Sequence, residues 1–405
     1  MANIVRLIIR PYELNKMGSF SADSEADLLG KDIGKALKDG GVDLALFGDS
    51  PIEEQSRPEI DMIEDDVQIR ELIGKKNRVV EAEPLGGKVP EDFRNMLADS
   101  NFDQDYTVDF CIDGSLRTKY MGELIAGGSG APFVVSHVGA AAVKIDYDHH
   151  KALLYKIALK LAIYMPGPGT IPDATYQQIE MAAKKYRNVH VESLPPEETV
   201  GELRSAAGGK VRNMMHEVEL SMIDGLPEGR RYVALDGGLQ KQTFYKLEKT
   251  IAIAKGFSHK VIFLGNDGKV PRTISYLSRL RVGFRTPVFR YRVIRDSKSD
   301  KSEGDLSRSV FWYLKIRAPP PEMEPLGGIV KVGLPYNGES DSEIEKAADQ
   351  LSKAVLRISN PSTFPRPRWP SFIYPIRVAE SYLSTCLYNA NYFVKLGVTI
   401  RRGMV

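Results

Sequence analysis

The chain has 405 residues, of which 42% are hydrophobic and 27% are charged, the composition of a globular protein with a sizeable core. Its formal net charge of +2 excludes a uniformly basic surface, so any nucleic-acid contact must come from a local basic patch. Two cysteines without CxxC spacing exclude a disulfide framework. No signal-peptide pattern and no apolar run of about 18 residues is present, so we expect a cytoplasmic protein without a membrane span.

The first hundred residues are predicted as a polar N-terminal region. A helix is expected over 21–38, where Ser or Asp side chains can cap it, and a second helix toward the end of the charge-rich stretch 61–78. The acidic run 61–66 is typical of a solvated face, and a contact to a basic partner is the alternative. A loop over 84–90, with two glycines between prolines, separates this region from the first core strand.

Residues 106–147 predict a β-meander. Its first strand, 106–115, contains Asp113 followed by Gly and Ser, so we expect this carboxylate where the strand leaves the sheet. The glycine-rich turn 127–130 lacks the Lys-Ser/Thr pair and the helix start of a P-loop, which disfavours an ATPase. The segments 116–125, 132–138 and 142–146 follow, and two antiparallel strands are predicted there after the first strand.

The segment 148–210 is predicted as a helical insertion between parts of the core. An apolar helix is expected over 151–165, and the Pro-Gly-Pro-Gly run 166–169 ends it. A second helix over 171–186 and a short strand over 189–191 follow.

A helix over 211–226 carries two acidic candidates. At 3.6 residues per turn Glu219 falls inside the apolar stripe, whereas Glu217 lies on the polar side. A buried glutamate without a partner costs several kcal/mol or becomes protonated, so a metal ion or a basic neighbour is the expected partner of Glu219. The alternative is that Glu219 borders the stripe and reaches water.

A second strand, 232–236, ends in Asp236 followed by two glycines, and the strand 250–255 ends in Lys255. Three carboxylates on rigid elements, Asp113, Glu219 and Asp236, suit divalent metal ions and phosphodiester chemistry. A lysine at the rim of such a site suits the scissile phosphate, although an ordinary strand-end lysine is the alternative. A helix is expected over 240–249.

Basic and aromatic residues are grouped in two places of the last third. Arg290 and Arg292 share one face of a predicted hairpin, and Arg366, Arg368 and Trp369 lie together in a proline-rich loop. With Tyr374 they are the candidate nucleic-acid contacts, and an ordinary charged sheet face is the alternative for the hairpin. The remaining predicted elements are a strand over 261–264, a helix over 272–285, hairpin strands over 287–294 and 309–317, a strand over 328–334, helices over 341–358 and from residue 374, and a closing strand over 393–401.

Taken in order, these motifs resemble those of NurA-type nucleases. Asp113-Gly-Ser after a strand, a glutamate helix, Asp236-Gly-Gly-Leu, a strand ending in Lys255 and Tyr374-Pro opening a late helix follow the family's order over about residues 106–390. The resemblance implies an α/β fold with an RNase H-like mixed β-sheet core flanked by helices. This core would comprise 101–147 and 211–405, with an N-terminal region over 1–100 and the helical insertion over 148–210.

The resemblance also implies the residue roles. Matched by position, Asp113, Glu219 and Asp236 are the metal-binding acids, and Lys255 is the family's lysine. On the helix opened by Tyr-Pro the family usually presents a histidine, and this chain has Glu380 there, which makes Glu380 a further candidate ligand.

Within the glutamate helix, Glu217 stays the alternative to Glu219 as the ligand. The implied activity is DNA hydrolysis with two Mn²⁺ or Mg²⁺ ions, in DNA repair and end processing beside a HerA-type hexameric translocase, and we expect a homodimer. The alternative function is a catalytically inactive RNase H-like scaffold that binds DNA or a partner protein.

Overall fold

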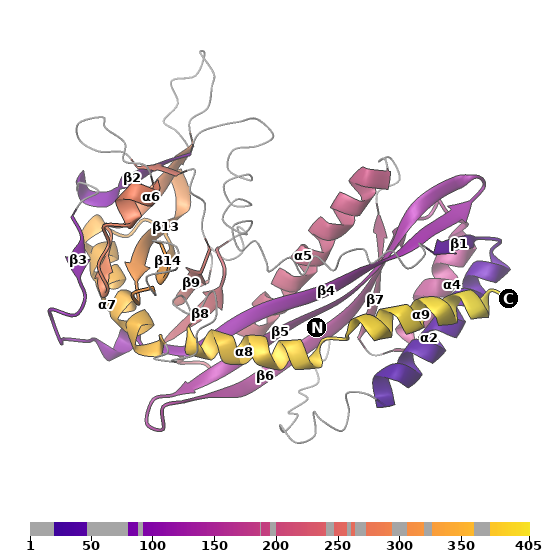
Figure 1. Ribbon diagram of the computed structural model, residues 1–405, viewed down its shortest axis with the longest axis horizontal. Coiled ribbons are helices and arrows are strands. Elements are labelled where there is room, and N and C mark those ends of the chain that lie inside the picture. Colours follow the sequence, from indigo (N-terminus) through magenta and orange to yellow (C-terminus); the bar gives the residue numbers. More distant parts are fainter. Residues whose placement is uncertain are drawn as a thin grey trace, which may run out of the picture.

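The computed structural model describes residues 20–46, 80–87, 92–186, 188–194, 200–239, 247–256, 261–263, 273–293, 306–319, 326–359 and 373–405. Within these residues the chain forms a mixed α/β fold, with one large sheet flanked by helices (Figure 1). The sheet strands lie in the order β10-β2-β12-β13-β14-β9-β8-β4-β5-β6-β7. Three short strands pair off this path, β1 with β4, β11 with β13, and β3 with β11.

The strands are bounded by β1 Asp43–Leu46, β2 Val80–Pro84, β3 Arg94–Asn95, β4 Val108–Ala126, β5 Ser129–Asp146, β6 Lys151–Pro166, β7 Val189–Leu194, β8 Tyr232–Asp236, β9 Thr250–Ala254, β10 Val261–Phe263, β11 Phe284–Arg285, β12 Phe289–Val293, β13 Leu306–Lys315 and β14 Ile329–Pro335. The helices are α2 Phe20–Asp39, α4 Asp173–Lys184, α5 Val200–Asp224, α6 Thr273–Leu277, α7 Asp341–Ile358, α8 Tyr374–Cys386 and α9 Ala390–Gly403, with short 3₁₀ turns at Leu85–Gly87 and Gln104–Tyr106.

Three long antiparallel strands, β4, β5 and β6, lie next to the β7 edge of the sheet and extend along the length of the molecule (Figure 1). On the other edge of β4 the order continues with β8 and then β9, both parallel to β4. The predicted meander is confirmed with fewer and longer strands, because residues 116–125 continue β4 and residues 132–146 lie in the single strand β5. A two-glycine turn at Gly127 and Gly128, both with positive φ, joins β4 to β5.

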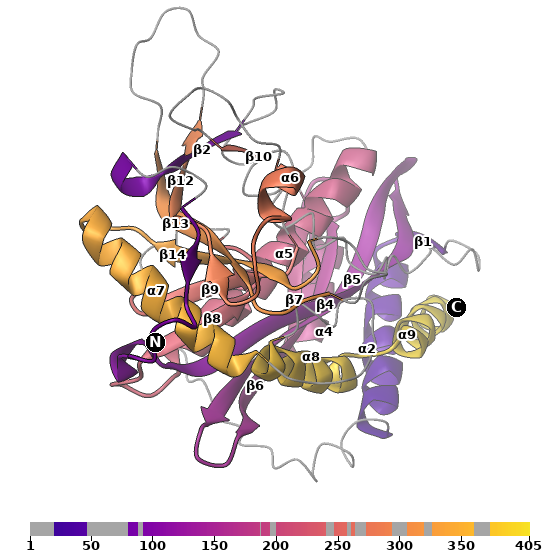
Figure 2. The ribbon, with the colours of Figure 1, turned by 60° about the vertical axis from the view of Figure 1, so that its left-hand side comes forward.

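Helices α5 and α8 cover opposite faces of the meander (Figure 2). Along β5 the side chains alternate between the two faces, as strand geometry requires. Ala140 and Ala142 pack with residues of α5, whereas Ala141 and Val143 pack with Ala379 of α8. Residues of β4 before its register shift at Tyr120 can therefore be assigned to the α5 face or the α8 face by their position along the strand.

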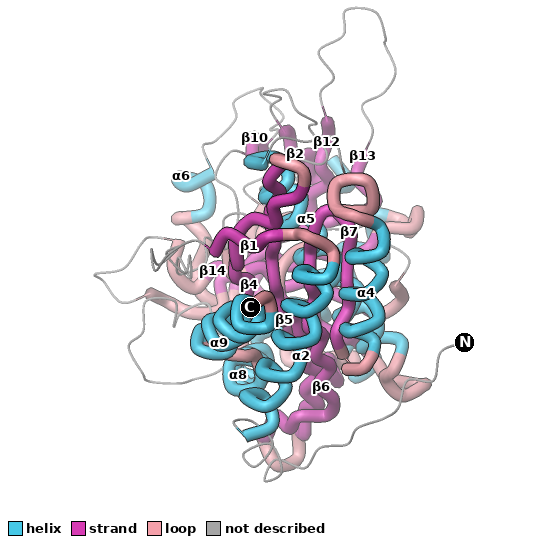
Figure 3. The backbone as a smooth tube through the Cα atoms, turned by 90° about the vertical axis from the view of Figure 1, so that its right-hand side faces the viewer, coloured by secondary structure: helices cyan, strands magenta, loops and turns pink. Residues whose placement is uncertain are grey.

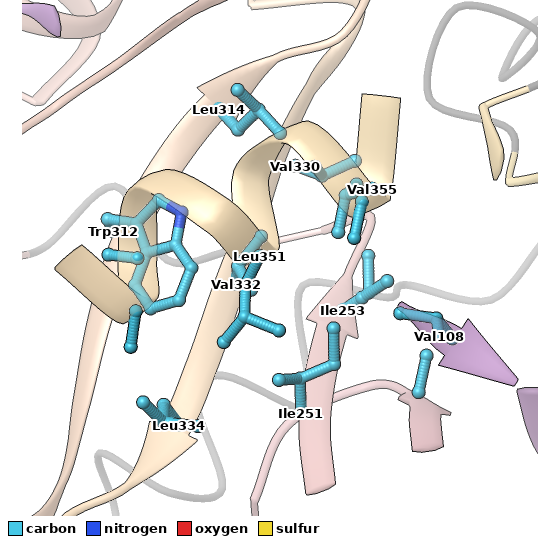
Figure 4. Packing of buried hydrophobic residues seen from close by; sticks show 14 of the residues in the cluster. Val108, Ile251, Ile253, Trp312, Leu314, Val330, Val332, Leu334, Leu351 and Val355 are labelled. Atoms are coloured by element: carbon cyan, nitrogen blue, oxygen red, sulfur yellow. The ribbon is translucent and has the colours of Figure 1, made fainter. Parts of the chain in front are cut away.

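Two further layers close the ends of the sheet. At one end, α2, α4 and α9 pack together and share an apolar cluster with β1, β4, β5, β6 and β7 (Figure 3). At the other end, α7 covers the strands β13, β14 and β9 with a large apolar cluster (Figure 4). In this cluster Trp312 is fully buried, and its indole Nε1 donates a hydrogen bond to Ser352 Oγ at 2.8 Å, which satisfies its one polar atom.

Two predicted elements are wrong. Residues 151–165 form strand β6 instead of an apolar helix, because they pair with β5 along the length of the strand. From Leu161 onward β6 is buried on both faces, which accounts for its continuous apolar sequence there. Residues 393–401 belong to helix α9 instead of a closing strand. Here the buried residues Phe393, Leu396 and Ile400 follow helical spacing against α2, and this packing overrides the β-branched residues between them.

Two predicted regions also join the sheet. The segment 148–210 supplies β6 and β7 to it, so it is not a helical insertion, although α4 and β7 agree with the predicted helix over 171–186 and strand over 189–191. The polar N-terminal region likewise contributes β1, which pairs with β4, and β2, which pairs with β10 and β12. The expected helix over 272–285 is short, because α6 ends at Leu277 and β11 begins at Phe284.

Most other elements match the predictions, including α2, α5, β8, β9, β10, β14 and the hairpin of β12 and β13. Helix α7 spans the predicted residues 341–358, where Ser340 and Glu343 form a capping box. The predictions for 61–78, for the proline-rich loop 361–370 and for residues 240–246 lie outside the described residues. None of the described helices is long and apolar enough to cross a membrane.

Candidate active site

The site lies where β8 ends beside β4. Strand β4 pairs with β8 only up to Ile112, and β1 joins the same edge from Gly122 onward. In the described part of the chain the edge of β4 over 113–121 therefore has no strand beside it, and we call this stretch the edge gap. Asp113 lies at the start of the edge gap, and Asp236 is the last residue of β8 next to it.

The predicted position of Asp113 at the end of its strand is wrong. Its neighbour β5 continues to pair across this point, with Asp113 opposite Ala141 and Gly114 opposite Ala140, so the backbone of β4 stays extended. What ends here is the pairing with β8. The carboxylate of Asp113 is buried at this point, with only 5% of the residue exposed.

Asp113 and Asp236 face the same side of the sheet. Asp113 lies opposite Ala141, which packs on α8, and Asp236 lies two residues beyond Ala234, which faces the large cluster on this side. Lys255 follows β9, the next strand, and its Nζ lies 3.0 Å from Asp236 Oδ2. The adjacent strands β4, β8 and β9 thus bring the two aspartates and the lysine together from three separate parts of the sequence.

Helix α8 adds a fourth charged group. Glu380 Oε1 accepts a hydrogen bond from Lys255 Nζ at 2.5 Å, and Glu380 Oε2 lies 2.8 Å from Arg377 Nη1, one helical turn earlier. Glu380, which the sequence analysis gave only as a further candidate ligand, therefore lies in the same cluster as Asp113, Asp236 and Lys255. Arg377 was not predicted, and its spacing of three residues before Glu380 on a helix is the signal that could have found it.

The position of α8 is fixed at its far end by β4. Arg117, which lies within the edge gap, donates three hydrogen bonds to carbonyl oxygens at the end of α8, those of Ser384, Leu387 and Tyr388, at 3.0–3.1 Å. A guanidinium at this position satisfies carbonyls that a helix leaves without partners and complements the negative end of its dipole. Strand β4 thus carries Asp113 and also holds the helix that carries Glu380.

The pKa values reflect an excess of acidic groups. Burial raises the pKa of Asp113 well above its ordinary value, and the carboxylates of Asp236, Glu380 and Glu219 raise it further, while Lys255 offsets part of the shift. Burial alone would lower the pKa of Lys255, but Asp236, Glu380 and Asp113 together raise it. Although burial raises the pKa of Glu380, Lys255 and Arg377 lower it below its ordinary value.

Glu219 approaches from the other face of the sheet. It is 5% exposed on α5, and a Cβ atom added to Gly114 would lie 2.2 Å from its Oε1, so only glycine lets this carboxylate come so close to β4. Its other oxygen, Oε2, lies 2.8 Å from Nδ1 of the buried His216. Gly114 and His216 were not predicted, although the spacing of three residues between His216 and Glu219 is a helical pair signal.

The structure separates the two glutamates of α5. Glu219 is buried beside Gly114, whereas Glu217 is exposed on the opposite side of the helix. Of the two residues left open by the sequence, only Glu219 lies near Asp113. The structure therefore favours Glu219 over Glu217 as the acid of this site.

The donor set suits hard divalent cations. Carboxylate oxygens are the ligands that Mg²⁺ and Mn²⁺ prefer, and an added positive charge would relieve the repulsion that raises the pKa of Asp113. Among the described residues no three acidic, histidine or cysteine side chains already surround a common metal position. In the present arrangement the ammonium of Lys255 lies against two of the acids.

The predicted nucleic-acid contacts are only partly described. The Arg290 guanidinium is half-buried and stacks on the ring of Tyr336, 4.3 Å from its centroid. Tyr374 begins α8 and is 36% exposed. The side chain of Arg292 and the residues Arg366, Arg368 and Trp369 lie outside the described residues.

Comparisons with known proteins give little. No family model matches the chain, and no curated protein sequence matches it. The solved structure of endonuclease V from Bacillus subtilis is similar over 70% of this chain and 82% of its own chain, with 13% sequence identity and a TM-score of 0.28. A TM-score this low does not establish a common fold.

Proposed function

We propose that the protein is a metal-dependent deoxyribonuclease. The observation that carries the proposal is the convergence of acids at the edge gap: Asp113 and Asp236 lie on adjacent parallel strands and face the same side of the sheet, with Glu380 on that side. Glu219 adds an acid from α5 on the opposite face, against Gly114, and it is among the carboxylates that raise the pKa of Asp113. Such a set of carboxylates on rigid strands and helices is suited to hydrolysis of phosphodiesters.

Two Mn²⁺ or Mg²⁺ ions fit this donor set. Asp113 and Asp236 would hold them, and Glu219 and Glu380 would contribute from the two helices. When bound, such ions supply an activated water and stabilise the leaving oxygen of the phosphodiester. The chain itself fixes the acids: β5 keeps Asp113 in an extended strand, Gly114 admits Glu219, and Arg117 holds the end of α8.

Lys255 is the cationic group of the proposed site. Its ammonium is buried among the acids, with 9% of the side chain exposed, and it keeps Asp236 and Glu380 near each other. A lysine at this position suits a phosphate oxygen of the substrate. Arg377 holds the second oxygen of Glu380, so this carboxylate keeps a partner if Lys255 turns toward a phosphate.

The wider biological role is proposed from the order of the motifs. The antiparallel strands β6, β5 and β4 followed by the parallel strands β8 and β9 support an RNase H-like core. We extend the NurA resemblance to DNA end processing in the cytoplasm, with a HerA-type hexameric translocase and a second copy of this chain as partners. Copurification with such a translocase and the mass of the purified protein in solution test these two partners.

Replacing Asp113 by Asn tests the activity directly. With Mn²⁺ and end-labelled DNA, the purified Asp113→Asn variant should lose degradation by a factor of about 10³ or more, because the acid is central to the donor set. Glu217→Gln is the matched control, since Glu217 is an exposed acid on α5 that faces away from the site. Unchanged cleavage by folded Asp113→Asn would overturn the proposal.

A catalytically inactive scaffold is the second candidate, and one observation favours it. Lys255 and Arg377 already neutralise part of the acidic cluster, as in a structural ion-pair network. Calorimetric titration with Mn²⁺ separates the two functions. Binding that disappears in Asp113→Asn supports the nuclease, and no binding to the wild type supports the scaffold.

A further inference from the structure

Lys255 occupies the region where the proposed metal ions would lie. Its Nζ contacts Asp236 Oδ2 at 3.0 Å and Glu380 Oε1 at 2.5 Å, and the lysine side chain is 9% exposed. These two oxygens belong to the acids proposed as metal-binding groups. An oxygen atom that accepts a hydrogen bond from an ammonium at this distance has that direction filled, so a metal ion and Lys255 compete for it.

The surroundings of Lys255 explain why a cation is needed there without metal. Asp113 is 5% exposed, and its carboxylate lies near those of Asp236 and Glu380. Buried carboxylates that lie close together destabilise a fold unless a positive group lies between them. Lys255 supplies this group from the end of β9, the strand next to β8.

The lysine is also placed so that it can leave. It follows the last residue of β9 and precedes Gly256, and its four-carbon side chain carries a compact ammonium at its tip. Glu380 keeps Arg377 Nη1 as a partner at 2.8 Å when Lys255 turns away. Displacement of Lys255 therefore breaks two contacts and leaves neither the helix α8 nor the strand β9 without its own support.

We propose that Lys255 is the resident cation of the metal-free site, and that divalent metal ions displace its ammonium from Asp236 and Glu380. This inference rests on the proposed nuclease function and adds its regulation: metal loading and release of Lys255 are one coupled event. The released ammonium remains beside the acids, where a DNA phosphate is the partner of opposite charge. Lys255 thereby weakens metal binding in the absence of DNA.

Calorimetry with Lys255→Met tests the competition. The variant should bind Mn²⁺ about tenfold more tightly than the wild type, because no ammonium competes for the acids. In chelator it should unfold at a lower temperature than the wild type, and saturating Mn²⁺ should remove this difference. Lys353→Met is the matched control, because Lys353 is similarly buried, with 11% of its side chain exposed, and pairs with Asp99 at 3.2 Å.

Chemical labelling of the wild type gives a second test that needs no variant. An amine-reactive acetylating reagent followed by peptide mass spectrometry should label Lys255 poorly in chelator and several-fold faster with saturating Mg²⁺, with Lys353 as the internal reference. Unchanged Lys255 labelling at saturating Mg²⁺ would overturn the inference. So would equal or weaker Mn²⁺ binding by folded Lys255→Met.

Different results would disprove the nuclease function and the displacement of Lys255 by metal ions. If the wild type binds no Mn²⁺, the proposed nuclease function fails, and the regulation by Lys255 fails with it. If the wild type binds Mn²⁺ and Asp113→Asn does not, but Lys255→Met binds like the wild type, only the displacement of Lys255 is wrong.

Discussion

Two clusters of buried charge in this protein differ in their balance. Beneath α7, Arg285 is fully buried and, with Arg94, contacts the two carboxylates of Glu345 and Asp349. At the edge gap, the carboxyl groups of Asp113, Glu219, Asp236 and Glu380 are accompanied by Lys255 and Arg377 and, on the α5 face, by His216.

The ratio of acidic to basic groups indicates what each cluster is suited for. Two arginines and two acids in the α7 cluster satisfy each other, and Arg285 also donates to the carbonyl of Thr286 at 2.8 Å. A balanced network of this kind fixes a helix on a sheet. The edge gap holds more acids than permanent cations, and this excess is what leaves room for added positive charge.

The largest effect on stability is expected in the balanced cluster. Arg285→Leu should lower the free energy of unfolding by about 3–5 kcal/mol, because it leaves the buried Glu345 and the half-buried Asp349 without their central partner. Denaturant unfolding measures this loss. Arg94→Leu is the control, since the Arg94 side chain is 41% exposed and its loss should cost about 1 kcal/mol or less. Equal losses in the two variants would show that the α7 cluster is not held by Arg285.

Gly114→Ala should have an intermediate effect, confined to the edge gap. The new methyl group would lie 2.2 Å from Glu219 Oε1, so the carboxylate must move, at a cost of about 1–3 kcal/mol in stability and with weaker Mn²⁺ binding. Gly208→Ala on α5 is the control, because a Cβ there meets no atom within 4 Å. Unfolding and calorimetry that do not distinguish the two variants would contradict the close approach of Glu219.

The excess of acid also predicts a dependence of stability on pH. The folded-state pKa of Asp113 is raised, so the folded protein holds a proton that the unfolded chain releases near the ordinary value of 3.8. The free energy of unfolding therefore decreases with pH: the contribution of Asp113 to stability falls as pH rises above 3.8 toward the raised pKa.

Asp113→Asn removes this loss. In chelator near neutral pH the variant should be more stable than the wild type by about 1 kcal/mol or more, and the difference should shrink in acid. Thermal unfolding at a series of pH values measures it. A variant that is less stable than the wild type at neutral pH would mean that the acids at the edge gap are already balanced.

The smallest effect separates the two glutamates of α5. Glu219→Gln should weaken Mn²⁺ binding by about tenfold, whereas Glu217→Gln should leave binding unchanged and stability within about 0.5 kcal/mol. Calorimetric titration of the matched pair checks this. Equal effects would contradict the assignment of Glu219 to the site.

Local signals in the sequence predicted much of the fold. The amphipathic pattern over 341–358 was enough for α7, and the apolar stripe of α5 correctly placed Glu219 inside. Strand β6 and helix α9 were not predictable in this way. Their apolar residues fit both periods, and the choice was made by neighbours distant in sequence, β5 for one and α2 for the other.

In the site, too, some features follow from local sequence signals and others depend on residues distant in sequence. Two strands that each end their mutual pairing at an Asp-Gly step could be predicted to bring Asp113 and Asp236 together. The contact of Lys255 with Glu380 could not be predicted from local patterns, because Glu380 lies 125 residues later on a helix, and only the family resemblance made Glu380 a candidate. The mid-strand position of Asp113 also depends on pairing with β5, which no local pattern around residue 113 reports.

The contact of Arg117 with the end of α8 has a mechanical consequence. One rigid strand holds an acid and, four residues later, the anchor of the helix that presents another acid. The distance between Asp113 and Glu380 thus depends on two fixed lengths: the part of β4 from Asp113 to Arg117, and the part of α8 from its anchored end back to Glu380. Replacing Arg117 would allow α8 to shift along its axis. The distance between Asp113 and Glu380 would then change although neither residue had been altered.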